Sequence, residues 1–163
     1  MRVFGNRLQG LTLIELLVTL AILSILAMAA MPFAEITVKR NKEQELHRAL
    51  RRVRTAIDRF HEDWLGGRIA KSNDNASSDG YPKNLQVLID GVEKADAKGG
   101  KIYYLRRIPH DPFASSDEPL EEQWEIRSYQ DDRDTVVSSG NDVYDIHSKS
   151  ERTALDGTSY KDW

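Results

Sequence analysis

The apolar positions of this chain are concentrated in one long segment near its start. Residues 10–34 read GLTLIELLVTLAILSILAMAAMPFA, and Glu15 is the only charged side chain among them. About 20 consecutive apolar residues are enough to cross a bilayer as a helix. A carboxylate inside such a span costs about 2.5–3.5 kcal/mol at its centre and less near the interface. The pattern therefore predicts a membrane-spanning helix whose single acid has a partner.

The charged segment that follows, residues 35–64, has the period of an amphipathic helix. Pro32 lies at the junction, where it removes a backbone donor and is expected to kink or loosen the helix. We predict one helix over 11–64, apolar on all sides in its first half. In its second half apolar residues recur at three- and four-residue intervals and form one stripe for a core: Leu46, Ala49, Leu50, Val53, Ile57, Phe60 and Trp64.

The rest of the chain, residues 65–163, shows short elements separated by polar loops. A short amphipathic helix is expected near 82–90. Strands are expected near 124–129 and 143–147, because these segments alternate and are rich in aromatic and branched residues. Residues 93–101 are expected to be another polar stretch of loop. The predicted fold class is α+β, with the long N-terminal helix packed against a small antiparallel sheet.

Composition excludes some kinds of function. The chain has 163 residues and a net charge of −3, and the part beyond residue 34 holds 21 basic and 25 acidic residues. A mildly acidic head argues against a nucleic-acid-binding surface. The absence of cysteine excludes disulfides and a Cys-ligated zinc. The four histidines are scattered along the chain, so we do not expect an enzyme.

The first ten residues, MRVFGNRLQG, carry two arginines and no acid. A short basic leader before an apolar span stays on the cytoplasmic side of the membrane. A secretory signal peptide also begins with basic residues, but its apolar core is about 7–15 residues long. The apolar run here is longer than that, and the helical pattern continues beyond it.

Gly10, followed by Leu11-Thr12-Leu13-Ile14-Glu15 and a long apolar helix, resembles the start of type IV pilins and of type II secretion pseudopilins. The resemblance implies that prepilin peptidase cleaves between Gly10 and Leu11, removes residues 1–10 and methylates the new amine of Leu11. Glu15 falls at the fifth mature position and Pro32 at the twenty-second, where that family has its acid and often its proline. One departure is Leu11, where the family most often has phenylalanine.

Two later segments resemble the major, G-type pseudopilins. They are the corner Ile108-Pro109-His110-Asp111-Pro112-Phe113 and the strand Val143-Tyr144-Asp145-Ile146-His147-Ser148. These pseudopilins hold calcium in a loop near the C-terminus, a hard cation on oxygen ligands. The resemblance implies Asp156 and Asp162 as ligands here. A plain turn with an aromatic cap explains the same residues slightly better.

The implied function is structural. The protein would polymerise through residues 11–34 into a periplasmic pseudopilus that drives protein export by type II secretion. In the filament, Glu15 would pair with the amine of Leu11 on a neighbouring subunit, and the stripe in 35–64 would belong to the core of the head. Some arginines beside that stripe would meet acids of neighbouring subunits.

The partners implied by the resemblance are other copies of the chain, minor pseudopilins, prepilin peptidase, and an inner-membrane assembly platform with its cytoplasmic ATPase. The expected location is the bacterial inner membrane, crossed once, with the head 65–163 in the periplasm. A type IV pilin for motility, adhesion or DNA uptake is the close alternative. A monomeric membrane-anchored binding module is the alternative from a different class.

Overall fold

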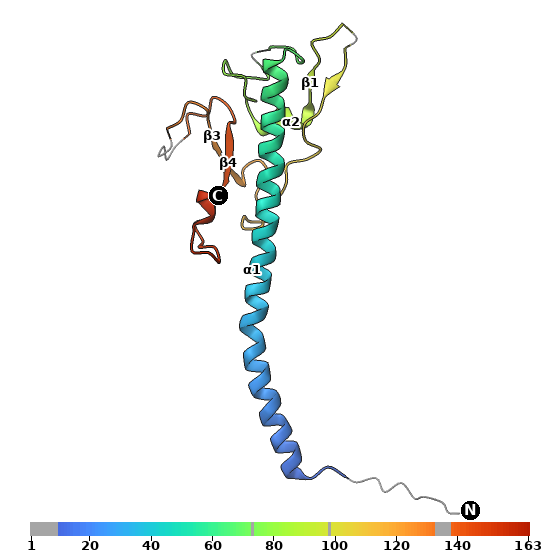
Figure 1. The fold of residues 1–163 in the computed structure, drawn as a ribbon, viewed down its shortest axis with the longest axis vertical. Helices are drawn as coiled ribbons and strands as arrows, with labels where there is room; N and C mark the ends of the chain where they lie inside the picture. The colour runs from blue at the N-terminus through green and yellow to red at the C-terminus, as the bar shows by residue number, and fades with distance from the viewer. Residues whose placement is uncertain (1–9, 73, 98, 133–137) are drawn as a thin grey trace, which may run out of the picture. The chain divides into compact units, whose positions relative to one another are not determined.

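The structure is a computed structural model that describes residues 10–163 except 73, 98 and 133–137, and it leaves out the side chains of residues 29–32 as well. The predicted leader, residues 1–10, therefore lies outside the described residues except for Gly10. The chain divides into two compact units, Met1–Lys39 and Arg40–Trp163. The fold is α+β, a long N-terminal helix with small antiparallel sheets (Figure 1).

The long helix α1 runs from Leu13 to Leu65, close to the predicted 11–64. It begins after Thr12, whose Oγ1 accepts a hydrogen bond from the backbone N–H of Glu15 at 3.3 Å. Such a side-chain acceptor satisfies one of the free N–H groups in the first turn of a helix. At the other end Gly67 has φ +63°, the left-handed conformation in which many helices end.

The core of the second unit is built on α1. The predicted stripe is buried there, except that Trp64 is only half-buried, and Ala56 joins it. Burying one large apolar side chain contributes about 1.5–3 kcal/mol. The core is closed by residues far along the chain, among them Trp124, Val143, Ile146 and Tyr160. The stripe thus packs within its own subunit, as the sequence predicted.

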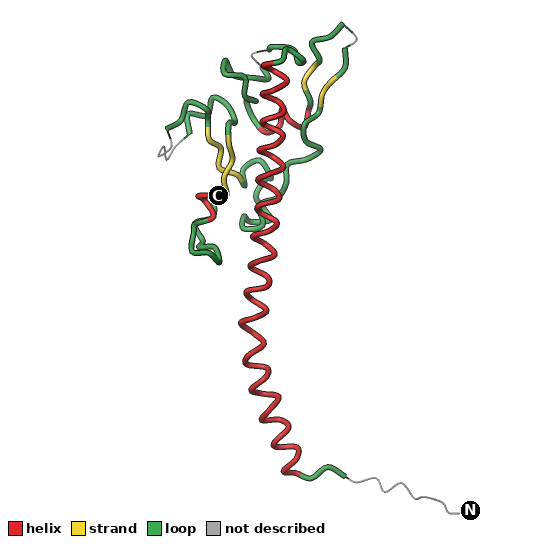
Figure 2. Tube along the Cα trace, viewed as in Figure 1, coloured by secondary structure: helices red, strands yellow, loops and turns green. Residues whose placement is uncertain are grey.

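The shorter elements form two separate two-stranded sheets rather than one (Figure 2). β1 pairs with β2 and β3 pairs with β4, both antiparallel, with Ile126 opposite Ile146 in the second sheet. The elements after α1 are α2 (Leu85–Asp90), β1 (Val92–Glu93), β2 (Lys101–Ile102), β3 (Trp124–Arg127), β4 (Asp145–Ser148) and the 3-10 helix η1 (Tyr160–Asp162).

The β1–β2 hairpin encloses the polar stretch expected over 93–101, and among the described residues of that stretch only Glu93 and Lys101 belong to its strands. Each of its strands has two residues, too few for an alternating pattern to appear in the sequence. β3 also ends earlier than the predicted 124–129. There the backbone N–H of Ser128 bonds to the carboxylate of Asp131 and that of Tyr129 to Asp142, so neither N–H continues the strand.

Arg54 fastens the C-terminal part of the chain to α1. Its guanidinium contacts the Asp145 carboxylate at 2.6 Å and donates to the carbonyls of Ile146 and Trp163 at 3.1 and 2.6 Å. Burial alone would raise the pKa of Asp145, but hydrogen bonds from His147 and Arg54 outweigh it and lower the pKa. A carboxylate that stays ionised suits this position, because the pair holds β4 against the helix.

A buried carboxylate organises the proline corner at residues 108–113. Asp111 is 1 % exposed, and it accepts hydrogen bonds from Ser148 Oγ at 2.6 Å and from the N–H of Phe113 at 2.8 Å. Its own N–H donates to Gln123 Oε1 at 3.1 Å. The two segments that resemble G-type pseudopilins are therefore joined by the Asp111–Ser148 contact.

Candidate processing and assembly segment

The residues around the predicted cleavage point lie in the open just before α1. Gly10 and Leu11 are exposed, and Leu11 keeps 71 % of its surface. Thr12 caps the helix and Glu15 lies in its first turn. A negative charge in the first turn is favourable, because the free N–H groups carry partial positive charge. Gly10, Leu11 and Glu15 are thus brought together within the start of one helix.

The fold gives no reason for a glycine at position 10. Its φ is not in the left-handed region, and a Cβ added there would meet no atom within 4 Å. Gly80 is different, because it has φ +84° and its added Cβ would lie 2.4 Å from the ring of Trp64. The described fold therefore does not explain why residue 10 is a glycine.

The apolar half of α1 is not covered by any of the described residues of its own unit. Every residue from Leu13 to Met28 is exposed, and twelve large apolar side chains from Leu11 to Met28 keep about half or more of their surface. Among the described residues this is the one helix long and apolar enough to cross a membrane. A surface of this size needs lipid or other protein around it.

Glu15 is the one polar side chain of residues 13–28 that is not satisfied inside the helix. Thr19 Oγ1 donates to the carbonyl of Leu16 at 3.0 Å, and Ser24 Oγ donates to that of Leu20 at 2.8 Å. Such back-bonding lets hydroxyls sit in apolar surroundings. The Glu15 carboxylate has no hydrogen bond or ion pair to any described residue. The described residues therefore provide no partner for this carboxylate.

Pro32 lies inside α1, which is assigned as helix without interruption from Leu13 to Leu65. The predicted kink or loosening at this residue, and its role in assembly, stay predictions. Along the helix Pro32 lies 17 residues beyond Glu15, about 25 Å at 1.5 Å per residue.

Comparison with known families agrees with this geometry. The family model of the prokaryotic N-terminal methylation motif matches residues 5–31. The chain carries a prepilin-type N-terminal methylation signal. This type IV pilin-like signal implies processing by prepilin peptidase and assembly into a filament, and together with the apolar helix it fits a single-pass membrane anchor. No curated protein and no solved structure matches the chain.

The predicted calcium ligands both lie in the C-terminal loop. Asp156 Oδ1 accepts the N–H and the hydroxyl of Thr158 at 2.9 and 2.7 Å, and these bonds lower the pKa of Asp156. Asp162 closes η1. Within the described part of the chain, no three His, Cys, Asp or Glu side chains are grouped to hold a metal ion. Backbone carbonyls would have to supply most of the six to eight oxygens that calcium takes.

The histidines have separate structural settings. His47 stacks on Trp163 and His61 on Tyr81, with ring centroids 4.1 and 4.2 Å apart. His147 Nε2 lies 3.3 Å from Asp145, a carboxylate that already binds Arg54. His110 is exposed beside a groove.

Sequence reasoning missed two groups that matter for the site and its support. Thr12 was a recognisable signal, because Ser or Thr three residues before Glu is the pattern of a capping box. Glu43 had no recognisable signal, because its partners lie more than 110 residues away in the sequence. Its carboxylate accepts hydrogen bonds from the N–H of Leu155 and the hydroxyl of Tyr160, both at 2.8 Å. Burial, with the bond to Glu43, raises the pKa of Tyr160.

Proposed function

We propose that this chain is a structural subunit of a type II secretion pseudopilus, which polymerises through residues 11–34. The observation that carries the proposal is the Glu15 carboxylate, which lies in an apolar helix within a methylation signal and has no partner among the described residues. In a filament the exposed apolar surface of each copy is covered by that of its neighbours. The head, residues 65–163, remains outside the apolar layer.

Cleavage would create the partner that Glu15 needs. Once the bond after Gly10 is cut, the chain begins with a positively charged amine at Leu11, close to the helix start. Pairing this amine with Glu15 of a neighbouring copy neutralises both charges in an apolar setting and sets the axial register between subunits. Such registry is the best-attested role of buried polar pairs.

The secretion pseudopilus is preferred to a surface pilus because of the head. Its proline corner and its strand β4, which resemble segments of G-type pseudopilins, are joined by the Asp111–Ser148 bond and share one core. This supports the proposal that the two likenesses belong to one structural arrangement and are not separate chance matches. The proposed partners are then minor pseudopilins, an assembly platform and a cytoplasmic ATPase, with the head in the periplasm.

Deleting the gene tests this proposal directly. We expect the deletion strain to retain exoproteins in the periplasm and the overexpressing strain to form filaments visible by electron microscopy. Loss of motility, adhesion or DNA uptake with normal secretion would instead identify a surface pilin. A monomeric anchored module predicts no filament in either strain.

The mature N-terminus provides a second test. We expect mass spectrometry of the assembled protein to find Leu11 as the first residue, with a methylated amine. Gly10→Val should block cleavage and leave a longer chain, although the structure has open space for the added side chain. The matched control is Ala21→Val, at an exposed position of the same apolar segment, where cleavage should be normal. An intact Met1 in assembled protein would refute the processing proposal.

Calcium binding by Asp156 and Asp162 is also proposed, and a thermal melt of the full chain in detergent tests it. Binding to the folded state alone raises stability by about 2.7 kcal/mol at a concentration one hundred times Kd. Tm should therefore rise with calcium and fall again with a chelator, and Asp156→Asn together with Asp162→Asn should remove the response. If the parent chain has the same Tm with calcium and with the chelator, the loop is a plain turn.

A further inference from the structure

The second unit exposes a row of arginines on the side of α1 that faces away from the core. We call Arg48, Arg51, Arg52 and Arg59 the arginine face; all four are exposed. Arg48 Nε donates to the carbonyl of Gln44, but no described carboxylate lies within salt-bridge distance of any of the four. Like charges three and four residues apart on a helix repel each other, so the arginine face destabilises the helix slightly.

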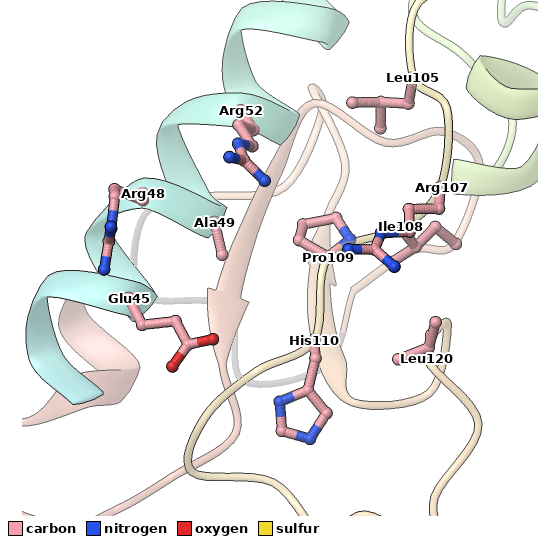
Figure 3. A pocket seen from close by; sticks show the side chains of 10 residues that line it. All are labelled: Glu45, Arg48, Ala49, Arg52, Leu105, Arg107, Ile108, Pro109, His110 and Leu120. Carbon is pink, nitrogen blue, oxygen red and sulfur yellow. The ribbon is translucent and has the colours of Figure 1, made fainter. Parts of the chain in front are cut away.

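A groove runs beside the arginine face. It has a volume of about 420 Å³ and lies between α1 and the segment 105–110. Figure 3 shows Arg48 and Arg52 on the helical wall and Arg107 on the other. Its apolar lining consists of Ala49, Leu105, Ile108, Pro109 and Leu120, and Glu45 and His110 complete it.

A second hollow of about 430 Å³ extends the groove along α1. It shares Arg48, Arg52 and Leu105 with the first and adds Arg51 and Arg59. The combined surface is cationic with an apolar floor. A surface of this kind suits a partner that has carboxylates around an apolar or aromatic centre.

The same unit exposes such a complement. Tyr129 and Tyr144 keep 52 % and 43 % of their surface, and each packs on Tyr81 with ring centroids 5.1 Å apart. We call Tyr129, Tyr144 and three carboxylates near them the acidic tyrosine patch: Asp58, Asp79 and Asp132. Asp132 comes three residues after Tyr129 in the sequence, and Asp142 is buried and accepts the N–H of Tyr129.

Contacts within the unit support this grouping. Burial raises the pKa of Tyr81. It is raised further by Tyr144, Tyr129, Asp58 and Asp142, so these four groups lie near Tyr81. Gln130, the residue after Tyr129, donates a hydrogen bond from its side-chain amide to the Asp79 carboxylate at 2.9 Å. Lys83 lines the hollow beside Asp79, so carboxylates outnumber cations there.

The two surfaces are adjacent at Asp58 and Arg59, but their centres lie on different flanks of α1. His61, which stacks on Tyr81 of the patch, comes two residues after Arg59 of the arginine face. Two residues turn an α-helix by about 200°. One copy can therefore present both surfaces at once.

We propose that the arginine face of one copy binds the acidic tyrosine patch of a second copy in the filament. This contact rests on the proposed function and goes beyond it by naming the head surfaces involved. The charges are complementary, and arginine and tyrosine are enriched in protein interfaces, where guanidinium groups stack on aromatic rings. Because the two surfaces are distinct, the contact is head-to-tail and can repeat without closing.

Cysteine crosslinking tests the contact, because the chain has no cysteine of its own. Arg52→Cys and Asp132→Cys replace exposed side chains, so both variants should fold and form filaments. A short bismaleimide is used, since a disulfide requires Cβ atoms within about 4.5 Å. We expect a dimer when the two single variants are co-expressed, a ladder of oligomers from the double variant, and no product from either single variant alone.

Charge reversal gives an independent measure. Arg48→Glu with Arg52→Glu should reduce filament yield at least about tenfold, because like charges then face each other across the contact. Adding Asp58→Lys and Asp132→Lys should restore the yield. Lys94→Glu is the control, an exposed lysine that lies outside both surfaces and should have no effect.

The outcomes separate the two proposals. Normal filaments from the parent chain, without crosslinks and without an effect of the arginine reversals, would overturn this contact and leave the filament intact. No filament from the parent chain would overturn both. The parent chain could also bind a duplex DNA probe that the arginine-reversal variant does not bind, while both give the same filament yield. The arginine face would then bind a polyanion, and the contact between copies would be refuted.

Discussion

Glu15→Ala is expected to abolish filament assembly while membrane insertion and cleavage after Gly10 continue. Removing one partner of a buried charge pair costs about 3–5 kcal/mol, because the other charge stays buried and unpaired. That is a loss of at least about a hundredfold in affinity for each added subunit. Insertion of the single chain should improve slightly, since a carboxylate in a span is unfavourable.

The experiment compares three chains in membranes and in the sheared filament fraction. The parent chain and Ser24→Ala should yield filaments, because Ser24 already satisfies its hydroxyl within the helix. Glu15→Ala should be found in the membrane, processed, with almost none in the filament fraction. A normal filament yield from Glu15→Ala would show that the acid has no partner in the assembly, and the proposed mechanism of registry would fail.

Asp111→Ala should lower the free energy of unfolding of the head by about 2 kcal/mol or more. The substitution leaves Ser148 Oγ and the N–H of Phe113 without their acceptor in a buried place. Each buried donor left unsatisfied costs about 1–3 kcal/mol. Urea unfolding of the full chain in detergent, followed by tryptophan fluorescence, measures the difference.

The neighbouring residue provides the control. His110 is exposed and lines the groove, so His110→Ala should change the free energy of unfolding by less than about 0.5 kcal/mol, as surface substitutions usually do. Asp111→Asn keeps the size of the side chain and one acceptor, and should lie between the two. Equal stability of the Asp111→Ala and His110→Ala chains would contradict a structural role for the buried carboxylate.

Local pattern predicted the long helix well, because its evidence lies within a few residues of each position. The stripe from Leu46 to Phe60 repeats over four turns, and Gly66-Gly67 stop it. The start of the helix was also within reach, since Thr12 and Glu15 have the spacing of a cap. The apolar span and its single acid likewise needed only composition to be recognised.

The remainder depends on pairs that are distant in sequence. Arg54 and Asp145 are 91 residues apart, and nothing in either neighbourhood selects the other. The strands β1 and β2 are defined only by their pairing. The proposed contact of Glu15 with a second copy would leave no periodic pattern in the sequence. Such contacts require the three-dimensional structure, or the assembly itself.

The bonds of Arg54 and Glu43 also impose an order on folding. Both side chains belong to α1, yet their partners come from residues 145–163. Closing loops this long costs conformational entropy before the contacts that offset it can form. We therefore expect the head to fold after α1. Until residues 145–163 have been synthesised, the stripe of α1 stays incompletely covered and is vulnerable to proteases and aggregation.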